Sequence, residues 1–385
     1  MKLSIVVSRF PFPLEKGDKL RIYHQIRELS QRHTIQLHCL TDKPLKEEWI
    51  NEIQQYCEEL HVYKLKKPLL YFNTLKQLFS AQPFQVGYFY QRKIKQQINA
   101  RIQTFKPNHI FAQLIRTTEY IKDIHEIPKT LDYMDALSKG MFRRAELASG
   151  FRKRLYLLEG KRLAEYENRI FDYFNHHCII SEQDRTFIQH PDHLKIAVIE
   201  NGISESFFEE LPAQKTTDLV FIGNMNYPPN VECAEYLVHQ ILPLLNSDTQ
   251  ITLAGASPNK RILALGEHPQ VTVTGWIDDI RTAYVSARIF VAPLFIGTGL
   301  QNKLLEAMAM GVPVITTPLA NNALGAKEGT EILIADDAKG FVHHISTLLK
   351  NESDYHEISA SAKSFVKQHY NWKSSSLALE KLFSH

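Results

Sequence analysis

The feature that most constrains the fold is the alternation of short apolar runs with helical patterns between residues 218 and 349. Such runs are typical of strands, and the amphipathic stretches between them are typical of helices. The predicted strands are Asp218–Ile222, Gln250–Ala254, Val271–Thr274, Ile289–Ala292, Val312–Thr316 and Ile332–Ile334. The predicted helices are Val231–Leu245, Asp279–Ser286, Gln301–Met310 and Ala338–Leu349. Strands that are apolar on both sides and joined by helices predict a parallel sheet covered on both faces.

The first half of the chain repeats this rhythm with longer connections. A strand, a helix and a second strand are predicted at Leu3–Ser8, Asp18–Arg32 and Thr34–Leu40. Further strands are predicted at His109–Ala112, Lys129–Asp132, Cys178–Ile180 and Ala197–Glu200. One unusually long helix, over 144–174, is expected before the strand at Cys178. The pattern predicts a second parallel α/β sheet.

A polar segment with a proline, residues 204–217, separates the two patterns and predicts a domain boundary. A length of 385 residues suits two domains. We expect an N-terminal domain over 1–204, a C-terminal domain over 205–367, and a last helix over 368–385 that crosses back to the N-terminal domain. Open parallel sheets bind ligands at the carboxyl ends of their strands, so a cleft between the domains is the expected site.

Charge and cysteine content exclude several classes of protein. Lys and Arg total 45 against 42 Asp and Glu, a net charge of +3 that is too balanced to require nucleic acid. Residues 1–205 carry 32 basic and 24 acidic side chains, so the first half is the basic one. The 4 scattered cysteines argue against disulfides or a zinc site and for a reducing compartment. No apolar stretch approaches the ~20 residues that span a bilayer, so we expect a soluble, cytoplasmic protein.

Residues 293–315 are the most informative segment, with the pattern strand, glycine loop, helix, glycine and strand. Gly297 and Gly299 flank Thr298 just before the helix. Glycines there allow backbone N–H groups to approach an anion at the positive end of the helix dipole. The loop is therefore a candidate phosphate site.

Within this helix, Asn302, Lys303 and Glu306 share one face with Gly299. At ~1.5 Å per residue, the loop, the lysine and the carboxylate span roughly 10 Å, the scale of a diphosphate followed by a ribose. A lysine neutralises phosphate oxygens, and a carboxylate accepts hydrogen bonds from both ribose hydroxyls. The alternative is an ordinary amphipathic helix whose Lys303 and Glu306 form a surface pair.

The segment 301–313 resembles the signature of family-4 glycosyltransferases, which are retaining enzymes with the GT-B fold. It is most similar to a bacterial branch that carries G-x-Q-N-K-x-x-E-A-M-A-M-G. Further elements resemble that branch in the same order, namely 11–13 with 16–21, 132–138, 200–202 and 221–230. The resemblance implies two Rossmann-like domains that face a cleft, C-terminal helices that pack back toward the N-terminal domain, and a nucleotide sugar as substrate with no cofactor.

The resemblance also implies roles on the donor side. Glu306 would hold the ribose, and Lys303 would replace the family's basic pair, because 223–230, which begins with Gly223, has no basic residue. The family's first glutamate is replaced by Thr298, so the transferred sugar must be contacted by the Gly297–Gly299 backbone, the Thr298 hydroxyl or another loop.

Two further loops are implied to border the donor. The backbone of Gly17 would approach the diphosphate, with Lys16, Lys19 and Arg21 nearby. The alternative is a solvated basic helix start. Gly275 and Trp276 would border the nucleotide base, and the alternative is a tryptophan packed under its loop.

Asp132 and Asp135 lie where a predicted strand ends, a position that suits acceptor contact or proton transfer. Asp135 would take the place of the family's acceptor-side histidine or aspartate. The alternative for both residues is a helix cap or a turn.

Two basic, aromatic regions, 63–72 and 141–162, could dock on an anionic leaflet if the acceptor is lipid-linked. The alternative is a solvated face whose lysine and arginine stems cover apolar surface. This would place the protein at the inner face of the membrane.

The sequence thus predicts a metal-independent hexosyltransferase that moves a sugar from a nucleotide-diphosphate donor to a hydroxyl acceptor, a glycan or lipid-linked, in surface polysaccharide or glycolipid synthesis. Retention of configuration is implied by the resemblance alone. Two other functions stay open: a nucleotide-sugar 2-epimerase-like enzyme, and a non-catalytic nucleotide-sugar-binding subunit.

Overall fold

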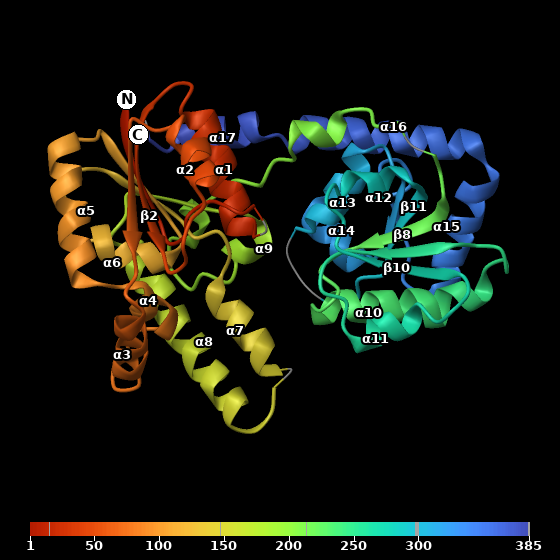
Figure 1. Ribbon diagram of the computed structural model, residues 1–385, viewed down its shortest axis with the longest axis horizontal. Coiled ribbons are helices and arrows are strands. Elements are labelled where there is room, and N and C mark those ends of the chain that lie inside the picture. The colour runs from red at the N-terminus through yellow and green to blue at the C-terminus, as the bar shows by residue number, and fades with distance from the viewer. Residues whose placement is uncertain (15, 147, 213, 297–299, 384–385) are drawn as a thin grey trace. The chain divides into compact units, whose positions relative to one another are not determined.

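The computed structural model describes residues 1–14, 16–146, 148–212, 214–296 and 300–383. The chain divides into two compact units: the first comprises Met1–Asn201 with Trp372–His385, and the second comprises Gly202–Asn371. Figure 1 shows that each unit is built around its own sheet with helices packed against it.

The described residues of the first unit form a seven-stranded sheet in the order β3-β2-β1-β4-β5-β6-β7. Every neighbouring pair is parallel. The strands are β1 (Lys2–Val7), β2 (Thr34–Thr41), β3 (Glu59–Lys64), β4 (His109–Gln113), β5 (Lys129–Asp132), β6 (His176–Ile179) and β7 (Ala197–Val198). The strand order reverses between β1 and β4, so the loops that follow these two strands diverge at the carboxyl edge.

Helices cover both faces of this sheet. They are α1 (Gly17–Leu29), α2 (Glu47–Gln54), α3 (Lys67–Gln77), α4 (Phe84–Phe89), α5 (Arg92–Phe105), α6 (Thr118–Ile121), α7 (Leu137–Glu146), α8 (Gly150–Phe171), α9 (Glu182–Arg185) and α17 (Trp372–Lys381). Ile5 and Val7 pack with α1 and α17, whereas Val6 between them packs with α5 and α8. Successive side chains of a strand point to opposite faces, so the run Ile5–Val7 must be apolar at every position.

The long helix predicted over 144–174 is present as the 22-residue α8, but it begins later than expected, because residues 144–146 belong to the preceding helix α7. α7 ends at Glu146, and α8 begins at Gly150, whose φ of +59° interrupts the helical backbone. The two helices then fold back on each other (Figure 1), and a Cβ at Gly160 would lie 2.8 Å from the Phe142 ring. Both helices are amphipathic, so the apolar pattern continues across the break.

The last helix of the chain completes the first unit. The rings of His24 on α1 and Trp372 on α17 stack with their centroids 4.6 Å apart. Leu379 and Phe383 are buried in the same core as β1. The C-terminal helix thus returns to the N-terminal unit, as expected from the predicted fold.

In the second unit, the described chain forms a six-stranded sheet in the order β10-β9-β8-β11-β12-β13. The strands are β8 (Thr217–Ile222), β9 (Ile251–Ala254), β10 (Val271–Gly275), β11 (Ala287–Ala292), β12 (Val314–Thr316) and β13 (Leu333–Ile334), and all their pairings are parallel. The order reverses between β8 and β11, where a second pair of loops diverges.

The helices of the second unit are α10 (Pro228–Tyr236), α11 (Lys260–Leu265), α12 (Arg281–Val285), α13 (Asn302–Ala309), α14 (Pro318–Leu324), α15 (Ala338–Lys350) and α16 (Glu352–His369). Two parallel sheets, each packed between helices, confirm the predicted fold class of two Rossmann-like α/β domains. Among the described helices, none combines the length and the apolar character needed to cross a bilayer.

Candidate active site

Glycines follow three adjacent strands of the second sheet. Gly223 comes after β8, Gly255 comes after β9, and Gly275 ends β10. The N–H of Gly223 donates to Ala254 O, and the N–H of Gly255 donates to Gly275 O, both at 3.0 Å. A Cβ on Gly255, whose φ is +134°, would lie 1.9 Å from Gly223 O, so no larger residue fits. The three loops are therefore held close together at the carboxyl edge.

Helix α13 brings Lys303 to the first of these loops. Its Nζ donates to Asn230 Oδ1 at 2.5 Å and lies 5.0 Å from the centroid of the Phe221 ring. Asn230 Nδ2 in turn donates to Asn224 O at 3.0 Å. A Cβ on Gly223 would meet Asn230 Nδ2 at 2.6 Å. The predicted residues Lys303 and Gly223 are thus brought together through Asn230.

Glu306, one turn further along α13, is held by a different helix. Its Oε2 accepts a hydrogen bond of 2.7 Å from the hydroxyl of Tyr284, a fully buried residue of α12. Lys303 and Glu306 are both half-buried. Each of the two charged groups bonds to a neutral side chain from another helix, an arrangement unlike a solvated surface pair.

Burial acts on the charge of both residues. It lowers the pKa of Lys303 and raises the pKa of Glu306, and each residue partly offsets the shift in the other through its opposite charge. An anion placed beside Lys303 would favour its charged form. The geometry therefore suits a ligand with a negative group near Lys303 and hydrogen-bond donors near Glu306.

The predicted glycine loop itself, Gly297, Thr298 and Gly299, lies outside the described residues. Asn302 is the first residue of α13 and is half-buried. Trp276 is 65% exposed, and its Nε1 donates to Asp278 Oδ1 at 3.0 Å. The interpretation of Trp276 as a residue packed under its loop is therefore wrong, and its contact with a base stays a prediction. Gly275 before it has a φ of +71°, which favours glycine.

In the first unit, Gly17 is the first residue of α1 and is exposed. A Cβ built on it meets no described atom within 4 Å. Packing therefore does not require glycine here, and a close approach of a ligand to its backbone stays a prediction.

Asp132 belongs to a buried polar cluster. Arg21 Nε lies 2.6 Å from Asp132 Oδ2, and both side chains are fully buried. One terminal nitrogen of Arg21 also donates to Ile199 O and Asn201 Oδ1, each at 2.8 Å. Three of the sequence elements that resemble one family thus meet in one cluster inside the first unit. This supports a structural role for Asp132.

Asp135, three residues later, remains exposed beyond the end of β5. Desolvation by the surrounding protein and the charge of Asp184 raise the pKa of Asp135 to about 6, and Arg116 opposes the shift. Met134 before it has a φ of +64°, an unusual conformation for a residue other than glycine. Strained backbone of this kind is common near binding sites.

Sequence reasoning missed three residues of these regions as site members: Asn230, Tyr284 and Arg116. Arg116 follows β4 at the switch point of the first sheet. Burial and the nearby charge of Arg9 lower its pKa to about 10, and its Nε finds no hydrogen-bond partner among the described residues. Its position after a predicted strand was a usable signal. The sequence around Tyr284 carries no such signal, because its pattern is typical of a core residue of an amphipathic helix.

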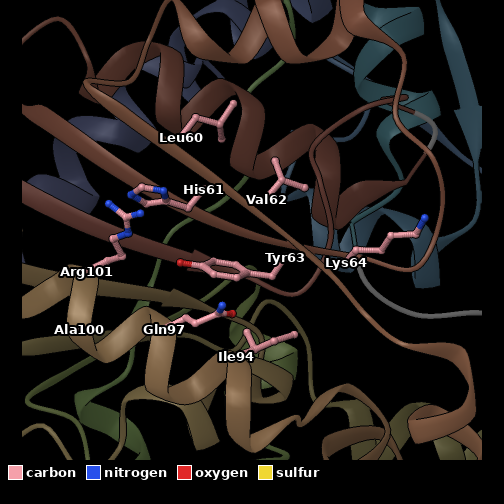
Figure 2. Close-up of a pocket in the computed structure, with 9 residues that line it drawn as sticks. All are labelled: Leu60, His61, Val62, Tyr63, Lys64, Ile94, Gln97, Ala100 and Arg101. Carbon is pink, nitrogen blue, oxygen red and sulfur yellow. The ribbon is translucent and has the colours of Figure 1, made fainter.

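Two cavities in the first unit differ in their relation to the switch point. One of about 430 Å³ lies beside the loops after β1 and β2 and is lined by four basic residues, one acidic residue and aromatic side chains. The charged residues are Arg9, Lys16, Lys19, Lys43 and Asp42. Another of about 500 Å³ runs along the edge strand β3 and helix α5, where His61 and Tyr63 face Arg101 (Figure 2). The first cavity therefore suits an anionic or sugar ligand, whereas the second lies at the edge of the sheet.

Part of the chain matches a known protein family. Residues 216–351 match a family model described as "Glycosyl transferases group 1". An uncharacterized 44.6 kDa protein in the cps region of Klebsiella pneumoniae is 23% identical over 400 residues, which cover 97% of each chain.

Solved structures resemble the whole chain. Sucrose-phosphate synthase from Thermosynechococcus elongatus is 14% identical with a TM-score of 0.72, covering 100% of this chain and 98% of that one. HepE from Anabaena, in complex with UDP, is 14% identical with a TM-score of 0.68 and covers 100% of both chains. HepE has also been solved with UDP-glucose, with a TM-score of 0.66, 14% identity and 100% of both chains covered. The fold is that of GT-B glycosyltransferases, and the matched domain supports a glycosyltransferase.

Proposed function

We propose that this protein transfers a hexose from a nucleotide-diphosphate donor to a hydroxyl group of a glycan or lipid-linked acceptor. The observation that carries the proposal is the paired placement of Lys303 and Glu306 on α13. Each is fixed by another helix, through Asn230 and Tyr284, beside the glycine loops at the carboxyl edge of the second sheet. UDP is the first nucleotide to test, since the similar HepE was solved with UDP and with UDP-glucose.

The donor would bind with its diphosphate toward Lys303. The ammonium group would neutralise the charge that builds up on the departing diphosphate, which is the step where a fixed cation helps most. Binding would also restore an opposite charge to a lysine whose pKa burial lowers. Glu306 would accept hydrogen bonds from the ribose hydroxyls, and the Tyr284 hydroxyl would keep its carboxylate in position.

We infer that Lys303 supplies the positive charge that a metal ion supplies in other transferases, so transfer should persist in EDTA. We also infer that the anomeric configuration is retained, as in the family that 301–313 resembles. The acceptor would bind in the first unit, near Asp135 and the basic cavity lined by Arg9 and Lys43. The relative in a cps region supports a role in surface polysaccharide synthesis.

The test is to incubate the purified protein with a panel of nucleotide sugars and glycan acceptors and to follow product by mass spectrometry. We expect Lys303→Ala and Glu306→Ala each to abolish transfer while thermal unfolding stays close to that of the natural protein. The matched control, Lys339→Ala, removes an exposed lysine of α15 and should leave transfer unchanged.

Two results would contradict the proposal in different ways. A donor that binds, shown by thermal shift, but is neither transferred nor hydrolysed would indicate a nucleotide-sugar-binding subunit. A donor recovered with an inverted ring carbon would indicate an epimerase. Full activity in either α13 variant would remove that residue from the site.

A further inference from the structure

Helix α3 presents its apolar side to solvent, opposite to the usual arrangement. It rests on the first unit through Leu70 and Gln77, both buried, and through Asn73, whose Nδ2 donates to Tyr90 O at 2.6 Å. Its large apolar side chains face outward. These are Tyr71, Phe72, Leu75, Leu78 and Phe79, and the exposed fraction reaches 71% for Tyr71 and 94% for Phe79.

Spacing gathers these side chains on one face. Tyr71, Leu75 and Leu78 lie at positions i, i+4 and i+7, and Phe72 and Phe79 are seven residues apart, so they form one stripe along the helix and the turn that follows it. A soluble chain rarely leaves a contiguous apolar surface of this kind uncovered, and such surfaces mark sites of association.

The basic residues around the stripe favour an anionic partner. Between Leu60 and Thr118 the sequence has no Asp or Glu at all, whereas it has ten basic residues. The basic residues are Lys64, Lys66, Lys67, Lys76, Arg92, Lys93, Lys95, Arg101, Lys106 and Arg116. Lys66, Lys67 and Lys76 are exposed on or beside α3 itself. An apolar stripe bordered by cations fits the boundary between headgroups and acyl chains of an anionic bilayer.

A second element carries the same combination. Phe151, at the start of α8, is 79% exposed and is followed by Arg152, Lys153 and Arg154. Arg162 of α8 donates to the carbonyl of Gln77 at the end of α3, at 2.8 Å. Both helices extend away from the sheet of the first unit (Figure 1). The two helices therefore belong to one lobe.

We propose that α3, with the first turns of α8, docks the protein onto an anionic lipid bilayer. α3 follows the carboxyl end of β3, and the α7–α8 pair follows the carboxyl end of β5, next to Asp135. The docking lobe is thus attached at the edge of the sheet where the proposed acceptor residues lie. A lipid-linked acceptor would reach that edge directly from the membrane surface. The docking itself does not depend on the proposed transfer reaction.

The test is flotation of the purified full chain with vesicles of phosphatidylcholine alone and of an equal mixture with phosphatidylglycerol. We expect binding to the anionic vesicles that weakens with added salt, and little binding to the neutral ones. Phe72→Ser with Phe79→Ser should reduce binding at least about tenfold, because two phenyl rings leave the acyl boundary. Lys66→Glu with Lys67→Glu should reduce it at least as much.

Matched controls change the same chemistry elsewhere. Leu244→Ser with Leu263→Ser removes two exposed apolar side chains of the second unit, and Lys339→Glu with Lys350→Glu reverses two exposed lysines of α15. Both should bind as the natural protein does, and all four variants should keep its circular dichroism and melting temperature.

Two outcomes would overturn the proposal. One is equal flotation of the natural protein and both α3 variants. The other is a natural protein that ignores vesicles but is a dimer by sedimentation velocity, with the phenylalanine variant monomeric. That result would assign the stripe to a second copy of the chain.

Discussion

Glu306 depends on a hydroxyl that lies 22 residues away in the sequence. Tyr284 donates to its carboxylate at 2.7 Å, and this bond holds down a pKa that burial otherwise raises. The orientation of the proposed ribose contact therefore depends on a residue that the donor itself would not touch. Tyr284 is best described as a positioning residue.

Tyr284→Phe should weaken donor binding about tenfold, since a hydrogen bond to a charged group contributes about 1.5–3 kcal/mol. Without the hydroxyl, the pKa of Glu306 rises further, so the loss should grow as the pH falls. Donor KM measured between pH 6 and 8 tests this. Tyr355→Phe on α16 is the control. A KM that is unchanged at every pH would separate Tyr284 from the site.

Asp135 offers a second test at this scale. If its carboxylate acts on the acceptor, transfer should rise with pH through about 6, its raised pKa, because the ionised form is the active one. Asp135→Asn should abolish this limb of the pH profile. Asp184→Asn removes a charge that raises the pKa of Asp135, so the limb should move to lower pH. If neither variant changes the pH profile of transfer, Asp135 has no role in transfer and is only a turn residue.

At the scale of elements, strands were predicted well where both faces are covered. Residues 289–292 of β11 are fully apolar and are buried in the structure. β3 was not predicted, because it is an edge strand whose residues are only partly buried and include Glu59, His61 and Lys64. α3 was missed as well, since most of its large apolar side chains face solvent and its two buried residues are Leu70 and the polar Gln77.

In the candidate site, too, the sequence predicted only what a local pattern records. Lys303 and Glu306 could be grouped from helical spacing alone, because they lie on one face of one helix. Asn230 and Tyr284 complete the arrangement from α10 and α12, and such contacts between distant segments leave no periodic signal. The roles of all these residues in transfer stay predictions.

Gly17 tests the proposed approach of the donor to the start of α1. Gly17→Ala meets no described atom within 4 Å, so the melting temperature should stay the same or rise slightly. Donor KM should nevertheless increase severalfold if phosphate oxygens contact this backbone. Gly255→Ala is the contrasting variant and should unfold or strongly destabilise the chain, because its Cβ overlaps Gly223 O. Unaltered kinetics in Gly17→Ala would exclude the close approach.

For the molecule as a whole, buried histidines make the first unit sensitive to acid. Burial lowers the pKa of five described histidines there, among them His33. The pKa falls to about 3 for His24, His38 and His109 and to about 4 for His177. Their ordinary pKa is near 6.5 in the unfolded chain. Each therefore stabilises the fold above pH 6.5, and each loses about 1.4 kcal/mol per pH unit below it.

Glu167 affects the pH dependence of stability in the opposite direction to the histidines. Burial raises its pKa to about 7, so it favours the fold as the pH falls from 7 toward 4.5. Burial also raises the pKa of Glu159, and that of Asp135 to about 6, so these carboxyls act in the same direction. The histidines outweigh these carboxyls, and the free energy of unfolding of the first unit should fall by several kcal/mol between pH 6.5 and 5. Trp276→Phe leaves Trp49 and Trp372, both in the first unit, as fluorescent reporters. Urea midpoints that are the same at pH 7 and pH 5 would contradict this prediction.

The packing of α17 against the first unit has a consequence for folding during translation. Leu379 and Phe383 belong to the same buried core as the side chains of β1. The first unit therefore cannot close until residues 372–383 have emerged from the ribosome, whereas the second unit has all its residues available earlier. The unit that is synthesised first is thus the last to complete its core, and during translation it stays incomplete while the second unit already has all its residues.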